Sequence, residues 1–397
     1  MKRIALCLLA VLMIGTCCLS SFALSTEKRE KTVAETVMPA NFSVEATSAI
    51  LMEATTGAVL FEQNAAAALP PASVTKVMTL LLVMEALDQE RITLTDTVTI
   101  SANAASMGGS QVFLEEGERM TVEDLIKCTV IASANDAAVA LAEYVAGSES
   151  AFVAQMNARA KELGLTATDF ENVTGLDDTV THHLTSAQDI AVMTRELLQY
   201  PLLFQYSSMW QDTIRNGEFT LTNTNRLVRF YEGCNGLKTG STDAAGFCVS
   251  VTATRDNMTL IAVIMGAATR DERNAIARTL LDYGFSTYAL YECPTKTVEI
   301  APVRAGKTDS TALTSEAFAC VVPKGSVSKV EEVYDLPSYV EAPIKAGDVV
   351  GKKTYLLNGE VIGTCDIYAE EDVEKISFFD IFLRYLTSAF CMNEKNS

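Results

Sequence analysis

The feature that most constrains this chain is a set of three short polar motifs in a fixed order. They are Ser73-x-x-Lys76, Ser133-Ala134-Asn135 and Lys238-Thr239-Gly240. Each motif alone is common, but the ordered set supplies a hydroxyl nucleophile, an amine and further groups that can serve an acylated serine. A fold that uses them must bring three segments, far apart in the sequence, to one site.

Residues 73–87 predict a buried helix that begins at the serine. Apolar residues recur at i, i+3, i+4, i+7 and i+10 without Pro or Gly, and these residues are Val77, Leu80, Leu81, Met84 and Leu87. On a helix, the hydroxyl of Ser73 and the amine of Lys76 lie on one face, one turn apart. The two groups can then meet.

The sequence around the motifs predicts helices grouped against an antiparallel sheet. Strand pairs are expected at 49–54 with 58–62 and at 246–254 with 258–266, each joined by a short turn. Helices are expected at 121–145, 150–163, 185–198 and 270–283. The second motif should interrupt the first of these helical segments near 133–136, and the third should lie on or beside a strand.

Beyond residue 292 the sequence changes to short runs rich in Val, Thr and Lys that are broken by Pro and Gly. This pattern predicts a small all-β unit that ends near Ala369. A final amphipathic helix is then expected, too short and too charged to span a bilayer, with one face formed by Phe379, Phe382, Leu383, Leu386 and Phe390. It is interpreted as an anchor lying along a membrane surface, and a helix docked on the protein is the alternative.

The N-terminus resembles an export signal. Lys2 and Arg3 precede an apolar run at 4–14, and a small-x-small site predicts cleavage after Ala23. At 397 residues the chain exceeds the usual size of a single domain. The expected organisation is a signal peptide at 1–23, a flexible leader at 24–44, a catalytic domain at 45–290, a β-rich domain at 291–372 and an amphipathic anchor helix with a tail at 373–397.

Composition argues against several classes of site. Without the signal, 29 Lys and Arg face 50 Asp and Glu, a formal charge of −21 that disfavours a nucleic-acid partner. Seven cysteines remain, an odd number without a C-x-x-C pair, which argues against a disulfide framework and a zinc site. The only histidines, His182 and His183, leave little for a Ser-His-Asp triad and are interpreted as loop residues with a packing or hydrogen-bonding role.

The motif side chains can be assembled into an acyl-transfer mechanism. Ser73 would be the nucleophile, and Lys76 would be its base if its amine is neutral. Burial and the nearby cation of Lys238 would lower the pKa of that amine. Ser133 would relay a proton to the leaving group, while Asn135 would hold Lys76 and the substrate amide.

The third motif would bind the substrate. Lys238 and Thr239 would meet a substrate carboxylate, and Gly240 leaves room for a close approach of the backbone. The oxyanion would be held by the backbone N–H groups of Ser73 and Ser241.

Taken together, these segments resemble the low-molecular-mass penicillin-binding proteins, the serine-type D-alanyl-D-alanine carboxypeptidases of peptidase S11 type. The resemblance covers most of the mature chain. Its most specific segments are Pro71-Ala72-Ser73-Val74-Thr75-Lys76, Ser133-Ala134-Asn135-Asp136 and Asn235-Gly236-Leu237-Lys238-Thr239-Gly240.

The resemblance implies an α+β fold like that of serine β-lactamases and penicillin-binding proteins, in which an antiparallel sheet and a helical subdomain precede a small all-β domain. It implies removal of the terminal D-alanine from peptidoglycan pentapeptide stems through an acyl-enzyme, covalent inhibition by β-lactams, and a location at the outer face of a bacterial membrane. It brings no metal or organic cofactor. Arg273 lies where the family places a basic residue near the substrate carboxylate, and a plain surface arginine is the alternative.

Three other functions stay open. A class A β-lactamase would need a deacylating glutamate after the second motif, where Glu171 lacks the expected sequence context and is interpreted as a loop acid. A transpeptidase or endopeptidase would use the same acyl-enzyme, and the motifs do not separate it from a carboxypeptidase. A wall-binding or β-lactam-sensing protein is disfavoured by the intact motifs. Thr174 stands where some relatives carry histidine, and Cys234 beside the third motif is interpreted as a bystander.

Overall fold

The computed structural model describes residues 40–178 and 180–393, without the side chains of residues 384 and 387–393. The expected signal peptide at 1–23, most of the expected leader at 24–44 and the tail at 394–397 lie outside the described residues. Within them, helices and antiparallel strands alternate up to Thr287, and strands continue to Ala369. This is the α+β class that the sequence predicts.

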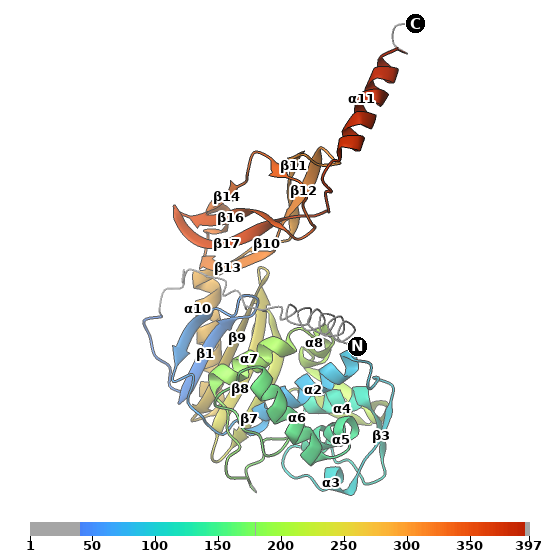
Figure 1. The fold of residues 1–397 in the computed structure, drawn as a ribbon. Coiled ribbons are helices and arrows are strands. Elements are labelled where there is room, and N and C mark those ends of the chain that lie inside the picture. The colour runs from blue at the N-terminus through green and yellow to red at the C-terminus, as the bar shows by residue number, and fades with distance from the viewer. Residues whose placement is uncertain (1–39, 179, 394–397) are drawn as a thin grey trace, which may run out of the picture. The chain divides into compact units, whose positions relative to one another are not determined.

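The first part of the fold is built on a five-stranded antiparallel sheet, in the order β2-β1-β9-β8-β7 (Figure 1). Its strands are β1 (Ser48–Glu53), β2 (Val59–Gln63), β7 (Cys234–Thr242), β8 (Gly246–Arg255) and β9 (Met258–Ala267). Both predicted hairpins are confirmed, because β1 pairs with β2 and β8 pairs with β9. The third motif lies on β7, at one edge of the sheet.

Both faces of this sheet are buried, because helices cover each of them. Side chains alternate along β9. Leu260 and Ile264 enter a core shared with α10 (Arg270–Thr287), whereas Ile261 and Met265 enter a second core. This second core is shared with α2 (Lys76–Asp88) and α7 (Ala187–Leu197).

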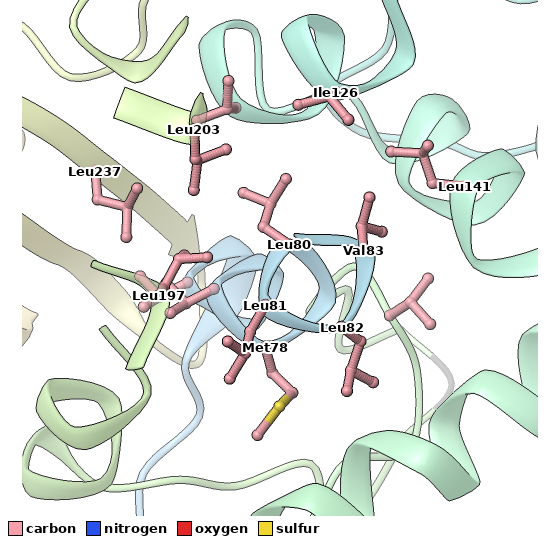
Figure 2. Close-up of a cluster of buried hydrophobic side chains, with 14 of the residues drawn as sticks. Met78, Leu80, Leu81, Leu82, Val83, Ile126, Leu141, Leu197, Leu203 and Leu237 are labelled. Atoms are coloured by element: carbon pink, nitrogen blue, oxygen red, sulfur yellow. The ribbon is translucent and has the colours of Figure 1, made fainter. Parts of the chain in front are cut away.

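Helix α2 is the centre of the helical part of the fold. Ten of its thirteen residues are buried, so the helix is covered on most sides rather than along one apolar stripe. Its side chains point in several directions toward residues from neighbouring elements, among them Ile126, Leu141 and Leu203 (Figure 2). The other helices are α3 (Ala102–Ala105), α4 (Val122–Ile131), α5 (Asn135–Ala146), α6 (Glu149–Glu162), α8 (Pro201–Ser207) and α9 (Leu227–Phe230).

The two helix-borne motifs sit at helix starts. Ser73 does not open an α-helix as predicted, since residues Ala72–Thr75 form a 3-10 turn and α2 begins at Lys76. The 3-10 turn still places Ser73 and Lys76 on one face, because side chains three residues apart eclipse each other in a 3-10 helix. Ser133 lies in the break between α4 and α5, which confirms the expected interruption.

Two short hairpins border the helical part. Strands β3 (Thr97–Thr99) and β4 (Arg119–Thr121) form one, and β5 (Gln211–Ile214) and β6 (Phe219–Thr222) form the other. A 3-10 turn, η2 (Arg215–Gly217), connects β5 to β6.

Residues 288–369 form the expected β-rich unit. Strand β10 (Tyr288–Cys293) pairs with β13 (Phe318–Pro323). The larger sheet has the order β14-β16-β17-β12-β11-β15. Its strands are β11 (Lys296–Arg304), β12 (Ser310–Ser315), β14 (Val330–Asp335), β15 (Val340–Glu341), β16 (Val349–Leu357) and β17 (Glu360–Ala369), and η3 (Val327–Lys329) precedes β14.

Helix α11 (Phe378–Asn393) follows at the predicted place. Among the described residues, none of the helices combines the length and the apolar character that crossing a bilayer requires.

One glycine outside the motifs fixes the position of the serine turn. Gly175 has φ +82°, and a Cβ there would lie 1.8 Å from the carbonyl oxygen of Ala72. We therefore expect Gly175→Ala to lower the free energy of unfolding by about 2–5 kcal/mol, from left-handed strain and overpacking. Urea unfolding measures this change.

Gly147→Ala is the matched control. Gly147 has a similar φ of +83°, but no atom lies within 4 Å of the place that a Cβ would take, so only the strain of about 1–2 kcal/mol applies. Equal losses in the two variants would contradict the packing argument.

Candidate active site

The hydroxyl of Ser73 lies beside a buried amine. The Nζ of Lys76 is 3.1 Å from Ser73 Oγ, and it also donates to Asn135 Oδ1 at 2.6 Å and to the carbonyl oxygen of Thr174 at 2.8 Å. Lys76 is fully buried. The oxygens of Asn135 and Thr174, from two separate segments, therefore hold one nitrogen against the Ser73 hydroxyl.

The surroundings disfavour the charged form of this amine. Burial, and second the ammonium of Lys238, hold the pKa of Lys76 well below its usual value, while the carboxylate of Asp136 acts in the opposite direction. Asp136 is itself buried and accepts hydrogen bonds from the backbone N–H groups of Val112 and Leu114. A neutral Lys76 amine can accept the proton of Ser73.

Ser133 faces the second lysine. Lys238 Nζ donates to Ser133 Oγ at 2.8 Å and to the carbonyl oxygen of Thr239 at 2.9 Å. Burial, and then the nearby guanidinium of Arg273, lower the pKa of Lys238 to about 7. Ser133 has a φ of +63°, a left-handed conformation that costs energy in a non-glycine residue and is common at functional sites.

Strand β7 runs directly alongside the serine turn. A Cβ at Gly240 would lie 2.8 Å from Ser73 N and 2.9 Å from Pro71 O, so only glycine permits this approach. The neighbouring Thr239 hydroxyl donates to Thr224 Oγ1 at 2.9 Å. The absence of a side chain at Gly240 is thus required by the packing of β7 on the serine turn.

A cavity of about 410 Å³ opens at this junction, within the range of ligand pockets. Ser73, Ser133, Thr239, Gly240, Ser241 and Arg273 line it. The alternative of a plain surface arginine is wrong, since Arg273 is only 2% exposed. Three further motif residues are not among those that line the cavity. Lys76 contacts the lining hydroxyl of Ser73, Lys238 contacts that of Ser133, and Asn135 contacts the amine of Lys76.

The other residues singled out in the sequence lie in supporting positions. His183 Nε2 is 2.7 Å from Thr75 Oγ1, and its Nδ1 accepts from Glu171 N, while burial lowers the pKa of His183 to about 4. The predicted hydrogen-bonding role is confirmed for this histidine. Burial raises the pKa of the Cys234 thiol to about 11, so this thiol is not activated as a thiolate.

Sequence reasoning missed several groups at the site. The Thr174 carbonyl is a backbone group and gives no sequence signal. Arg270 lies one helical turn before Arg273 and could have been found by that spacing. Trp210 and Arg226 also line the cavity, and only the tertiary fold brings them there.

Comparison with known proteins agrees with this geometry. The model of the family described as D-alanyl-D-alanine carboxypeptidase matches residues 32–269, and that of the penicillin-binding protein 5 C-terminal domain matches residues 285–375. D-alanyl-D-alanine carboxypeptidase DacF of Bacillus subtilis is 42% identical over 392 residues, covering 97% of this chain and 98% of the relative.

Comparison with solved structures also finds penicillin-binding proteins. Penicillin-binding protein 5 of Haemophilus influenzae has a TM-score of 0.75 and 32% identity, covering 85% of this chain and 99% of its own. Penicillin-binding protein D2 of Listeria monocytogenes in its ampicillin-bound form has a TM-score of 0.57 and 29% identity, covering 62% and 99% of the two chains. The chain belongs to the peptidase S11 family of D-alanyl-D-alanine carboxypeptidases.

Proposed function

We propose that this D-alanyl-D-alanine carboxypeptidase removes the terminal D-alanine from peptidoglycan pentapeptide stems through an acyl-enzyme on Ser73. The observation that carries the proposal is the 3.1 Å contact between Ser73 Oγ and the buried amine of Lys76. A free amine within hydrogen-bond reach is the base that a serine nucleophile requires.

In the first step, Ser73 Oγ attacks the carbonyl carbon between the last two D-alanines, and its proton passes to Lys76. The C–N bond breaks as the leaving amine takes a proton through Ser133, whose hydroxyl contacts Lys238. Asn135 orients the Lys76 amine and offers its amide to the substrate, although its Nδ2 also donates to the Gly108 carbonyl at 2.7 Å. Water then hydrolyses the ester.

The backbone N–H groups of Ser73 and Ser241 are proposed to hold the oxyanion. The close packing of β7 on the serine turn supports this role, because it sets the two segments side by side. Losing one such donor typically lowers turnover about 100- to 1,000-fold. Thr239 and Arg273 are proposed to bind the terminal carboxylate of the stem, with Lys238 acting through Ser133.

β-Lactams are proposed to acylate Ser73 by the same attack. The amine released when the lactam ring opens stays attached to the acyl group, so it cannot leave the site as D-alanine does. A class A β-lactamase would add a glutamate that activates water. Glu171 is a weak candidate, because its carboxylate accepts hydrogen bonds from the backbone N–H groups of Thr181 and His182.

Replacing the nucleophile tests the reaction. We expect Ser73→Ala to reduce release of D-alanine from a disaccharide pentapeptide by at least about a thousandfold, and to abolish labelling by a fluorescent penicillin. Mass spectrometry of the muropeptide measures the loss of one alanine, and thermal unfolding should change little.

Ser150→Ala is the control, because it changes an exposed serine outside the site and should leave both activities unchanged. A Ser73→Ala protein that still takes up penicillin covalently would refute the assignment of the nucleophile.

The pH dependence tests the two-lysine arrangement. The Lys238 ammonium lowers the pKa of Lys76, so Lys238→Met should raise that pKa and leave less free amine at a given pH. We expect the acidic limb of the rate of penicillin acylation to move to higher pH. An unchanged limb, or one that moves to lower pH, would show that Lys76 is not the titrating base.

We further propose that the chain is exported and acts at the outer face of the cell membrane, with domains at 45–290 and 291–372. The signal-like N-terminus supports export, and the change from mixed to all-β elements supports the division into domains. Exposed apolar side chains on α11 support membrane-surface binding, with Phe378 85% exposed and Phe379 65% exposed.

Vesicle binding tests the anchor. We expect the mature chain to co-sediment with phosphatidylcholine vesicles and Phe382→Asp to weaken this binding at least about tenfold, since a charge replaces a large apolar contact. Ile300→Asp is the control, because Ile300 is 66% exposed but lies on β11. Equal binding by the Phe382 variant and the unmodified chain would contradict the proposal.

A further inference from the structure

The β-rich unit contains a buried lysine that the proposed mechanism does not use. Lys353, on β16, is fully buried. Its Nζ lies 3.0 Å from Glu332 Oε2 on β14 and donates to Cys293 Sγ on β10 at 3.2 Å. One amine therefore connects three strands, and one of its two partners is a thiol.

The carboxylate of Glu332 organises this cluster. It accepts hydrogen bonds from Tyr291 Oη at 2.9 Å and Tyr334 Oη at 2.6 Å, and its Oε1 lies 3.5 Å from Cys293 Sγ. Burial alone would raise the pKa of Glu332, but hydrogen bonds from the two tyrosines and from Lys353 lower it to about 2. The carboxylate therefore stays charged and holds the amine beside the thiol.

Aromatic rings enclose the amine further. Lys353 Nζ lies 4.8 Å from the ring centroid of Tyr355 and 5.3 Å from that of Tyr334. The Tyr355 ring is itself buried and stacks on Phe318 at 4.0 Å between ring centroids. Close packing of this kind leaves few alternative rotamers, so the amine and the thiol of Cys293 are kept in contact.

Cys293 differs from the other thiols that the structure describes. Burial raises the pKa of Cys248 to about 11 and that of Cys320 to about 12. The Cys248 thiol donates to the carbonyl oxygen of Ala245. Among the six described cysteines, Cys293 is the one in hydrogen-bonding contact with a lysine amine.

We propose that molecular oxygen joins Cys293 and Lys353 through a sulfur–oxygen–nitrogen bridge. The 3.2 Å separation is too long for a direct bond between sulfur and nitrogen, and one oxygen atom fits between them. The side chain of Glu332 contacts both groups and is 24% exposed, so the pair lies close to solvent. Export, as proposed above, would remove the chain from the thiol reductants of the cytosol.

The oxidation balances with molecular oxygen as the co-reactant. The sulfur and the nitrogen each give up two electrons, and the two oxygen atoms take up these four. One oxygen atom bonds to Cys293 Sγ and to Lys353 Nζ. The other leaves as water with two of the three hydrogens that the thiol and the neutral amine carry, and the third stays on nitrogen. A thiolate with an ammonium carries the same three hydrogens, so the balance holds for that form as well.

The bridge would tie together two strands that are distant in the sequence. Cys293 and Lys353 are 60 positions apart, on β10 and β16. A covalent link across such a loop restricts the unfolded chain and so stabilises the folded form. We therefore expect the backbone N–H groups of β10 and β16 to exchange with solvent more slowly once the bridge has formed.

Peptide mass spectrometry tests the bridge. One sample of the full mature chain is equilibrated with air, a second is kept under nitrogen with dithiothreitol, and both are digested. We expect only the sample in air to yield a linked pair of peptides that contain residues 293 and 353. This pair should be about 14 Da heavier than the sum of its two peptides, because one oxygen is gained and two hydrogens are lost. Dithiothreitol added afterwards should release both peptides.

Variants at each end of the bridge serve as controls. Cys293→Ala and Lys353→Arg each remove one bridging atom, so neither should yield the linked pair. Lys353→Arg also keeps a positive charge beside Glu332, which covers the case in which Cys293→Ala does not fold. Cys320→Ala is the matched control, because it removes another buried thiol of the same core and should leave the bridge unchanged.

Three results would overturn the inference. The first is a chain in air whose two peptides stay unlinked, whether the Cys293 thiol is free or carries oxygen by itself. The second is a linked pair that has lost two hydrogens without gaining oxygen, since that mass belongs to a direct bond between sulfur and nitrogen. The third is a linked pair that persists in Cys293→Ala. The inference does not depend on the reaction at Ser73, and release of D-alanine by the same samples tests that reaction separately.

Discussion

The site depends on a lysine amine that is taken out of water. Burying an ammonium costs several kcal/mol unless the charge is paired, and Lys76 lies inside the apolar surroundings of α2. Its neighbours on the cavity side are oxygen atoms of Ser73, Asn135 and Thr174 rather than a carboxylate within hydrogen-bond distance. The oxygens of Asn135 and Thr174 satisfy the two N–H groups of a neutral amine, so burial favours the form that the proposed base requires.

Holding this amine against the serine requires narrowly defined backbone positions in segments that are distant in the sequence. Gly175 allows the loop that carries the Thr174 carbonyl to contact Ala72, and Gly240 allows β7 to contact the serine turn. Both contacts are too close for any side chain. The sheet links these positions to the core. Strand β7 pairs with β8, and β8 pairs with β9. One face of β9 packs in the same core as α2 and α7. The core therefore positions the side chains of the three motifs as well as stabilising the fold.

Much of this arrangement could be predicted from the sequence, because it is local. The apolar spacing after Ser73 predicted the buried helix, alternating residues predicted the hairpins, and the three motifs predicted the residues that meet. The 3-10 turn at Ala72–Thr75 could not be predicted, since the same residues fit the start of an α-helix and tertiary contacts with Gly175 and Gly240 decide between the two. The Thr174 carbonyl, Trp210 and Arg226 are tertiary features and leave no periodic signal.

The charge distribution around the cavity points to a functional origin for its arginines. Arg270 is the first residue of α10, where the positive end of the helix dipole disfavours a cation. The chain offsets this with Asp271 and Glu272 in the first turn, and Thr269 caps the helix by accepting from Glu272 N. A stable helix start would not need an arginine there. The stem peptide proposed as the substrate carries carboxylates, so a strongly acidic chain would repel it overall, and the cluster of cations around the opening would supply a local attraction toward the serine. The stability of the helix start therefore does not account for Arg270, whereas the proposed binding of an anionic peptide does.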